Sequence, residues 1–170
     1  MLKYIGVLSV AFSSVGFGVV GYDRTKRRER ELQDFRRVLV YLRDSLECLQ
    51  CGLDEAFSGG AKHCETEFKQ VLDEFLALLN KENGIRASEA WMQGLESAVL
   101  SLNEEDKAVL SDFGRGLDGH SFEAQKRNIL LALSETEGRL KDAAEQRMKN
   151  GKLSLKLGVF CGIGAILLLM

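Results

Sequence analysis

Four side chains that commonly bind metal lie close together in this sequence. Cys48 and Cys51 form a C-x2-C pair, and His63 and Cys64 follow a short distance along the chain. Three thiolates and one imidazole can hold a zinc ion. His63 and Cys64 are immediate neighbours, however, and this spacing matches no strong zinc-finger pattern. Small side chains on a helix in a reducing compartment account for the same cysteines. We therefore expect no metal and no cofactor, and keep a thiol- or zinc-dependent sensor as an alternative.

The other chemically capable residues do not form a catalytic set. His120 invites comparison with the phospho-accepting histidine of a phosphotransfer bundle, but it lies in a Gly-His-Ser turn rather than in mid-helix. The glycines around Arg115 follow no strand, so they do not form a phosphate loop. The acidic run 104–106 is typical of the first turn of a helix, where carboxylates complement the helix dipole. We expect a protein that is not an enzyme.

The elements that position these residues are predicted to be helices. The chain has no proline, and no strand-like alternation is present. Apolar residues recur with 3-4 spacing from Leu32 to Leu53, which places them on one stripe of a long helix. Similar stripes predict further helices that bury residues within 53–57, 68–79, 91–102, 109–117 and 122–143. The predicted fold class is all-α, a single helical bundle over residues 24–152.

Local signals predict where these helices begin and end. Asn103 and Asp106 have the spacing of a capping box. Ser88 and Ser121 are expected to cap the helices that follow them. Three glycines, Gly52, Gly59 and Gly60, are expected to bracket a short helix.

The two ends of the chain are predicted to cross a membrane. Residues 4–22 are nineteen residues without a charge, which reach about 28 Å as a helix. Residues 157–170 are also uncharged, and the apolar stretch extends back to Leu153 if Lys156 snorkels to the interface. A cleavable signal peptide is the competing interpretation of the first stretch, but no A-x-A site follows it. We expect an anchor over residues 1–23 and a second transmembrane helix over residues 153–170.

Charge predicts the orientation. Basic clusters lie on the inner side of both apolar stretches, at residues 24–30 and 147–156, and short basic loops stay in the cytoplasm. The middle domain is therefore expected to be cytoplasmic, with both termini across the membrane. Residues 31–146 hold 13 Lys and Arg against 23 Asp and Glu, a net charge of −10. Such an acidic body disfavours nucleic acid as a partner.

Gly158 and Gly162 stand four residues apart in the second apolar stretch. This small-xxx-small spacing allows close helix packing in a bilayer, so we predict possible self-association there, together with contact with the lipid bilayer.

Several stretches together resemble the stage III sporulation protein AB family. They run from Trp91 through the Leu102–Asp106 segment, the Phe113–Gly119 block and Gln125 to the Lys149–Gly158 run. The segment 51–57 also resembles a turn found in the F-type platform proteins of type II secretion. Asp118 departs from the pattern, because a glycine usually precedes this turn. The motif and structural positions that the resemblance marks are Trp91, Phe113, Gly114, Gln125, Gly151 and Gly158.

The resemblance implies an assembly role in the complex that links mother cell and forespore, in the mother-cell engulfing membrane. The partners it implies are a cytoplasmic secretion-type ATPase and other membrane channel subunits. Candidate docking residues are the acids Asp54, Glu55, Glu104, Glu105 and Asp106. A type II secretion or pilus-type platform subunit is the alternative, although such proteins usually carry two copies of the helical domain. A membrane-tethered phosphotransfer module is a further alternative.

Overall fold

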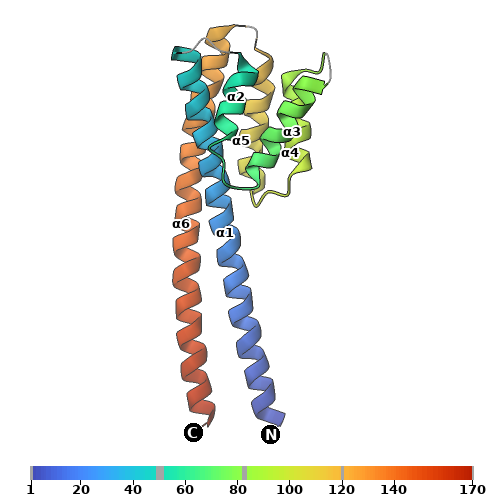
Figure 1. The fold of residues 1–170 in the computed structure, drawn as a ribbon. Helices are drawn as coiled ribbons and strands as arrows, with labels where there is room; N and C mark the ends of the chain where they lie inside the picture. Colours follow the sequence, from blue (N-terminus) through green and yellow to red (C-terminus); the bar gives the residue numbers. More distant parts are fainter. Residues whose placement is uncertain (1, 49–51, 82–83, 120, 170) are drawn as a thin grey trace. The chain divides into compact units, whose positions relative to one another are not determined.

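The computed structural model describes the backbone of residues 2–48, 52–81, 84–119 and 121–169, and the side chains of 23–46, 52, 54–81, 84–119 and 121–149. All regular structure in this part of the chain is helical (Figure 1), which confirms the all-α fold class. The elements are α1 (Leu2–Cys48), α2 (Leu53–Ala61), α3 (Phe68–Lys81), α4 (Ala87–Ser97), α5 (Glu104–Arg115), the 3-10 helix η1 (Gly116–Asp118) and α6 (Phe122–Leu169).

Tertiary contacts divide the chain into two compact units. Residues 27–141 form one unit, which holds the bundle, and residues 1–26 with 142–170 form the other. The predicted membrane spans belong to the second unit, and their side chains, with those of Gly151, Gly158 and Gly162, lie outside the described residues. Among the residues that the structure does describe, no helix combines the length and apolar character needed to cross a bilayer.

Within residues 27–141 the helices alternate in direction. Gly60 of α2 lies beside Val38 of α1, Gln70 of α3 donates to the Ser97 carbonyl at the end of α4, and Arg36 of α1 pairs with Glu137 of α6. We call the end of this unit that holds Arg27 and Lys141 the base, where α3 and α5 begin. The opposite end, where α2, α4 and α6 begin, is the tip.

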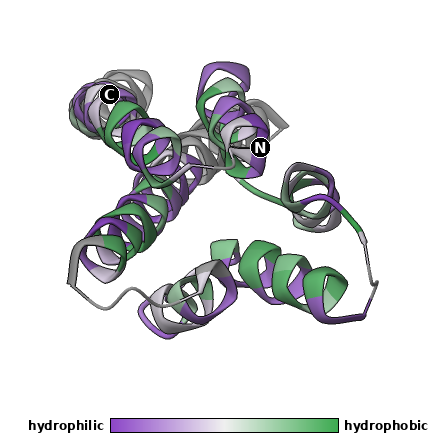
Figure 2. Cartoon of the chain, turned by 90° about the horizontal axis from the view of Figure 1, so that it is seen from above, coloured by the Kyte–Doolittle hydropathy of each residue, from purple (hydrophilic) through white to green (hydrophobic). Residues whose placement is uncertain are grey.

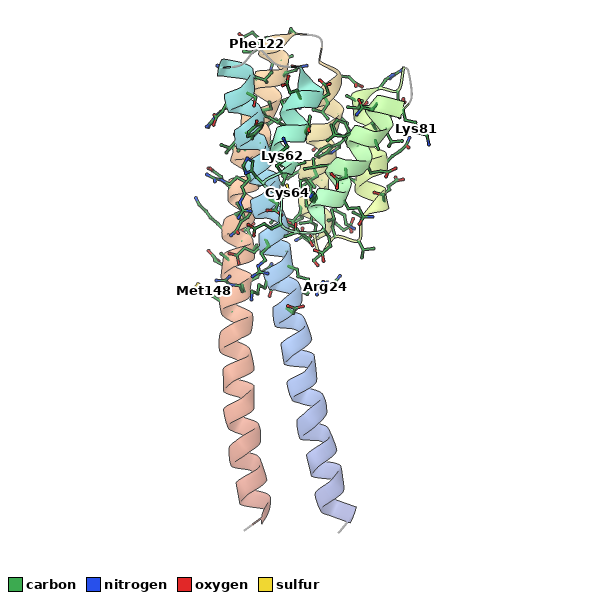
Figure 3. All side chains as sticks on the ribbon, in the orientation of Figure 1. Arg24, Lys62, Cys64, Lys81, Phe122 and Met148 are labelled. Carbon is green, nitrogen blue, oxygen red and sulfur yellow. The ribbon has the colours of Figure 1, made fainter. Side chains whose placement is uncertain are left out.

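Aromatic rings fill the centre of the bundle. Trp91 is fully buried, and its ring packs edge-on against Phe113 and Phe75 at centroid distances of 5.2 and 5.5 Å. Its indole Nε1 donates to the Leu110 carbonyl at 2.8 Å, so the polar atom is satisfied inside the core. Figure 3 shows the side chains crowded between these helices, and Figure 2, which looks along them, shows polar and apolar residues alternating around each one. The prediction that Trp91 is a core residue is confirmed.

Some predicted boundaries are confirmed and others are wrong. Asn103 and Asp106 form the capping box, and the Ser121 hydroxyl accepts the Ala124 N–H at 3.2 Å. Ser88 does not cap α4, which begins at Ala87; its hydroxyl donates to Asp118 instead. Gly59 and Gly60 lie inside α2 rather than after it, because the helix uses them to approach α1 closely.

The inner stripe of the last helix begins later than predicted. Phe122 follows the period of the buried residues but is 46% exposed. It is the first residue of α6, so no preceding helical turn covers its ring. Burial in this helix starts instead at Ile129 and continues through Leu133 and Thr136.

Candidate functional site

A buried ion pair holds the base of the bundle together. Arg28 Nε donates to Asp106 Oδ2 at 2.5 Å, and Arg28 Nη2 donates to Asp106 Oδ1 at 2.9 Å. The same carboxylate accepts the Asn103 N–H at 3.1 Å, as part of the capping box. Asp106 is 0% exposed. The prediction that it belongs to an exposed docking surface is therefore wrong, because α1 covers it.

The remaining candidate acids are exposed but separate. Glu104 and Glu105 lie at the base, where they pair with Lys107 and Arg139. Asp54 and Glu55 lie in the first turn of α2, at the tip. Glu104 and Glu105 lie near the level of Arg28 on α1, and Asp54 and Glu55 lie near its upper end. The helical rise along α1 between these two levels is roughly 27 Å. They therefore form two surfaces rather than one.

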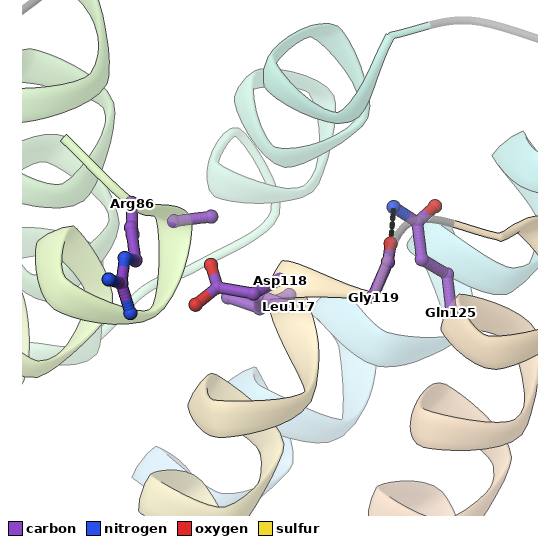
Figure 4. A pocket seen from close by; sticks show the side chains of 6 residues that line it. Arg86, Leu117, Asp118, Gly119 and Gln125 are labelled. Carbon is purple, nitrogen blue, oxygen red and sulfur yellow. Dashed lines mark hydrogen bonds between the residues drawn. The ribbon is translucent and has the colours of Figure 1, made fainter. Parts of the chain in front are cut away.

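A pocket of about 590 Å³ opens at the tip. It is lined by Arg86, Ala87, Leu117, Asp118, Gly119 and Gln125. Asp118 accepts the Ser88 N–H at 3.1 Å and the Ser88 hydroxyl at 2.5 Å, which ties η1 to the start of α4. The Gln125 amide donates to the Gly119 carbonyl at 3.2 Å (Figure 4). Arg86 is three-quarters exposed, pairs with Glu89 at 3.9 Å and lies across the pocket from Asp118.

The motif residues Phe113 and Gly114 act in packing. Phe113 is buried against Trp91, and its carbonyl accepts the Asn128 amide at 2.9 Å. A Cβ at Gly114 would collide with the Trp91 indole ring. The glycine therefore lets α5 and α4 approach each other.

Two further buried acids were not recognised from the sequence. Asp34 Oδ2 accepts the N–H groups of Glu65 and Thr66, both at 2.9 Å, so it ties the turn before α3 to α1. Glu31 Oε2 accepts the Ser101 N–H at 2.8 Å, whereas its Oε1 is buried without a hydrogen-bond partner. Burial raises the pKa of Glu31 from 4.5 to about 7. No local sequence signal marks such residues, because their partners lie far along the chain.

The cysteine set is only partly described. Cys64 is buried, its Sγ lies 3.8 Å from the Gly60 carbonyl, and burial raises the pKa of its thiol to about 12. The thiolate that zinc requires is therefore disfavoured at this position. The side chains of Cys48, Cys51 and His120 lie outside the described residues. No group of His, Cys, Asp and Glu suited to hold a metal occurs among the residues that are described.

The geometry defines a helical-bundle domain built between the first and last helices of the chain, with charged surfaces at its base and its tip. Comparison with known proteins identifies the family. The family model for stage III sporulation protein AB matches residues 3–170, so the chain belongs to this family. Stage III sporulation protein AB of Bacillus subtilis (strain 168) is 29% identical over 172 residues, covering 100% of both chains. A solved structure of a stage III sporulation protein AB is 28% identical with a TM-score of 0.65, and the match covers 71% of this chain and 96% of that one.

Proposed function

We propose that the chain is a non-enzymatic, membrane-anchored component of the sporulation complex between mother cell and forespore. Its bundle docks a cytoplasmic secretion-type ATPase, and its apolar ends hold it in the mother-cell membrane beside other channel subunits. The match to the family over residues 3–170, which includes both apolar ends, supports this role. The basic clusters next to those ends support the orientation.

The tip is the docking end in this proposal. Residues 116–125, from the end of α5 to the start of α6, belong to a stretch that carries the family resemblance, and they lie at the tip. The start of α2, within the segment 51–57 that resembles the F-type platform turn, lies at the same end, and this shared position is the observation that carries the proposal. Exposed Asp54 and Glu55 lie at the tip, as does the pocket between Arg86 and Asp118. A partner with basic side chains gains from the acids through electrostatic steering and complementarity.

Capture of the ATPase by the full-length chain in detergent tests the proposal. Asp54→Lys with Glu55→Lys should weaken capture, and binding should fall as salt rises towards about 1 M, where the Debye length is about 3 Å. The matched control is Glu104→Lys with Glu105→Lys at the base, which should leave capture unchanged. Failure of the unmodified chain to capture the ATPase would rule out the partnership. Loss of capture only in the Glu104→Lys, Glu105→Lys variant would mean that the docking surface lies at the base instead of the tip.

A further inference from the structure

The bundle carries its charge unevenly. The segment 49–118, which holds α2 to α5, has 6 Lys and Arg against 14 Asp and Glu. The parts of α1 and α6 within the unit, residues 27–48 and 119–141, have 10 Lys and Arg against 8 Asp and Glu. Two of those eight acids, Glu31 and Asp34, are buried, as is one of the ten basic residues, Arg28. The surface of α1 and α6 is therefore basic on a domain that is otherwise acidic.

The α1–α6 side also exposes apolar residues. Leu130 and Leu131 of α6 are 45% and 58% exposed. Arg127 lies one turn away on the same exposed side and makes no salt bridge within the described part of the chain. Arg36 of α1 pairs with Glu137 of α6, and Arg43, which pairs with Asp44, lies two helical turns closer to the tip on α1. We call this set the basic face: Arg36, Arg43, Arg127, Leu130 and Leu131.

The opposite side of the domain is acidic. In Figures 1 and 2 the α3–α4 hairpin lies across the bundle from α6. The middle of its outer surface exposes Asp73 and Glu74 from α3 with Glu89 and Glu96 from α4. We call these four residues the acidic face. Lys69 and Lys81 lie towards the two ends of α3, away from its centre, and exposed Arg86 before α4 pairs with Glu89 at 3.9 Å.

The two faces lie at the same height along the bundle. Arg36 pairs with Glu137, and Arg127 lies ten residues, or about 15 Å, closer to the tip. On the other side, the Phe35–Phe68 contact and the Gln70–Ser97 hydrogen bond bring the start of α3 and the end of α4 to the level of Arg36. From there Glu74 lies about 9 Å and Glu89 about 12 Å towards the tip.

We propose that copies of this chain pack side by side, the basic face of one copy against the acidic face of the next. The inference rests on the proposed membrane anchoring, which holds every copy the same way up. In that orientation Arg127 lies within about 3 Å of the height of Glu89 on the neighbour. The contact is heterologous, because different surfaces of the two copies meet, so it can add further copies in the same way. Exposed Leu130 and Leu131 supply the apolar area between the charges.

Crosslinking of the full-length chain in lipid vesicles tests the contact. Ser134→Cys on α6 and Gln93→Cys on α4 are exposed positions at matching heights. Each is placed in a Cys48→Ser, Cys51→Ser and Cys161→Ala background, and buried Cys64 is kept. When the two variants are mixed in the same vesicles, a short bismaleimide should join position 134 of one copy to position 93 of another. Ser58→Cys on the exposed side of α2 is the matched control and should not join position 134.

Charge reversal shows whether the faces touch directly. Arg127→Glu, added to the copy that carries Ser134→Cys, should lower the 93–134 product by about fivefold, the effect of about 1 kcal/mol in surface pairing. Glu89→Lys, added to the copy that carries Gln93→Cys, should restore the product, which it would not do if Arg127→Glu had damaged the fold. A 134–134 product as abundant as the 93–134 product would overturn the heterologous contact, because it indicates a symmetric dimer. Loss that Glu89→Lys does not restore would overturn the direct contact between Arg127 and Glu89.

Flotation of the same vesicles reports on anchoring separately. Protein that does not float with the vesicles contradicts the proposed membrane anchoring. Protein that floats but gives no 93–134 product overturns the side-by-side packing alone.

Discussion

Three polar residues of α1 tie the base of the bundle together. Arg28, Glu31 and Asp34 are each separated by three residues, so they share one side of the helix. Arg28 binds Asp106 at the start of α5, Glu31 accepts the Ser101 N–H before it, and Asp34 binds the turn that precedes α3. Each bond satisfies a buried polar group, and together they fix where two incoming helices begin.

Asp106→Asn should lower the free energy of unfolding by about 3–5 kcal/mol, because it removes the negative charge that the buried Arg28 guanidinium binds through two hydrogen bonds. Glu105→Gln, one residue earlier on an exposed pair, should cost less than about 1 kcal/mol. Thermal unfolding followed by Trp91 fluorescence measures both, since Trp91 is the single tryptophan and lies in the core. Equal costs for the two variants would mean that the pair with Arg28 does not stabilise the fold.

Glu31 should make stability depend on pH. Burial raises the pKa of Glu31 from 4.5 to about 7. Between these values the folded chain holds a proton that the unfolded chain releases, so the stability that Glu31 contributes falls as pH rises through this window. The unfolding free energy of the unmodified chain minus that of Glu31→Gln should decline from about pH 4.5 to about pH 7 and stay level above it. A difference that does not change with pH would show that Glu31 titrates normally.

At the scale of elements, the sequence predicts most of the helices but few of their contacts. The stripe from Leu32 to Leu46 and the Asn103–Asp106 capping box are local patterns, and both are confirmed. Ser88 fails as a cap because the carboxylate of Asp118, thirty residues away, takes its hydroxyl and its N–H. Local spacing cannot reveal a partner that only the tertiary fold brings near.

Helix contacts also decide which glycines are required. Gly114→Ala should cost about 1–3 kcal/mol, because the added methyl group would overlap the Trp91 indole ring. Gly138→Ala is the matched control, since nothing lies within 4 Å of the added group and alanine favours the helix by about 1 kcal/mol. Melting temperature and near-UV circular dichroism of Trp91 measure both. Stabilisation by both variants would mean that α5 does not approach α4 as closely as described.

At the scale of the whole molecule, the candidate site was predicted only in part. The acids Asp54, Glu55, Glu104 and Glu105 are exposed, but the fold places them at opposite ends of the bundle and buries Asp106. Composition gives the acidic net charge, whereas the division into a basic and an acidic side depends on which acids are buried and which helices lie opposite. Those facts come from packing, so the sequence pattern alone does not contain them.

The bundle should fold without the apolar ends. Tertiary contacts close within residues 27–141, and the core aromatic residues all lie inside that range. We predict a strongly helical circular-dichroism spectrum and a single cooperative melting transition for residues 27–150. In the same segment, Trp91→Ala should cost about 3–5 kcal/mol, because the ring fills the centre of the core. A non-cooperative transition would indicate that the bundle depends on the apolar ends for its packing.

Both termini should lie across the membrane from the bundle. The basic clusters at residues 24–30 and 147–156 both face the middle of the chain, and such clusters remain on the cytoplasmic side. Cysteines engineered at residues 2 and 169 should react with a membrane-impermeant maleimide added to intact cells. A cysteine in place of Ser58, exposed on α2, should react only after the cells are permeabilised. Labelling of position 58 in intact cells would reverse the predicted orientation. Labelling of position 2 without labelling of position 169 would mean that the second apolar stretch does not span the bilayer.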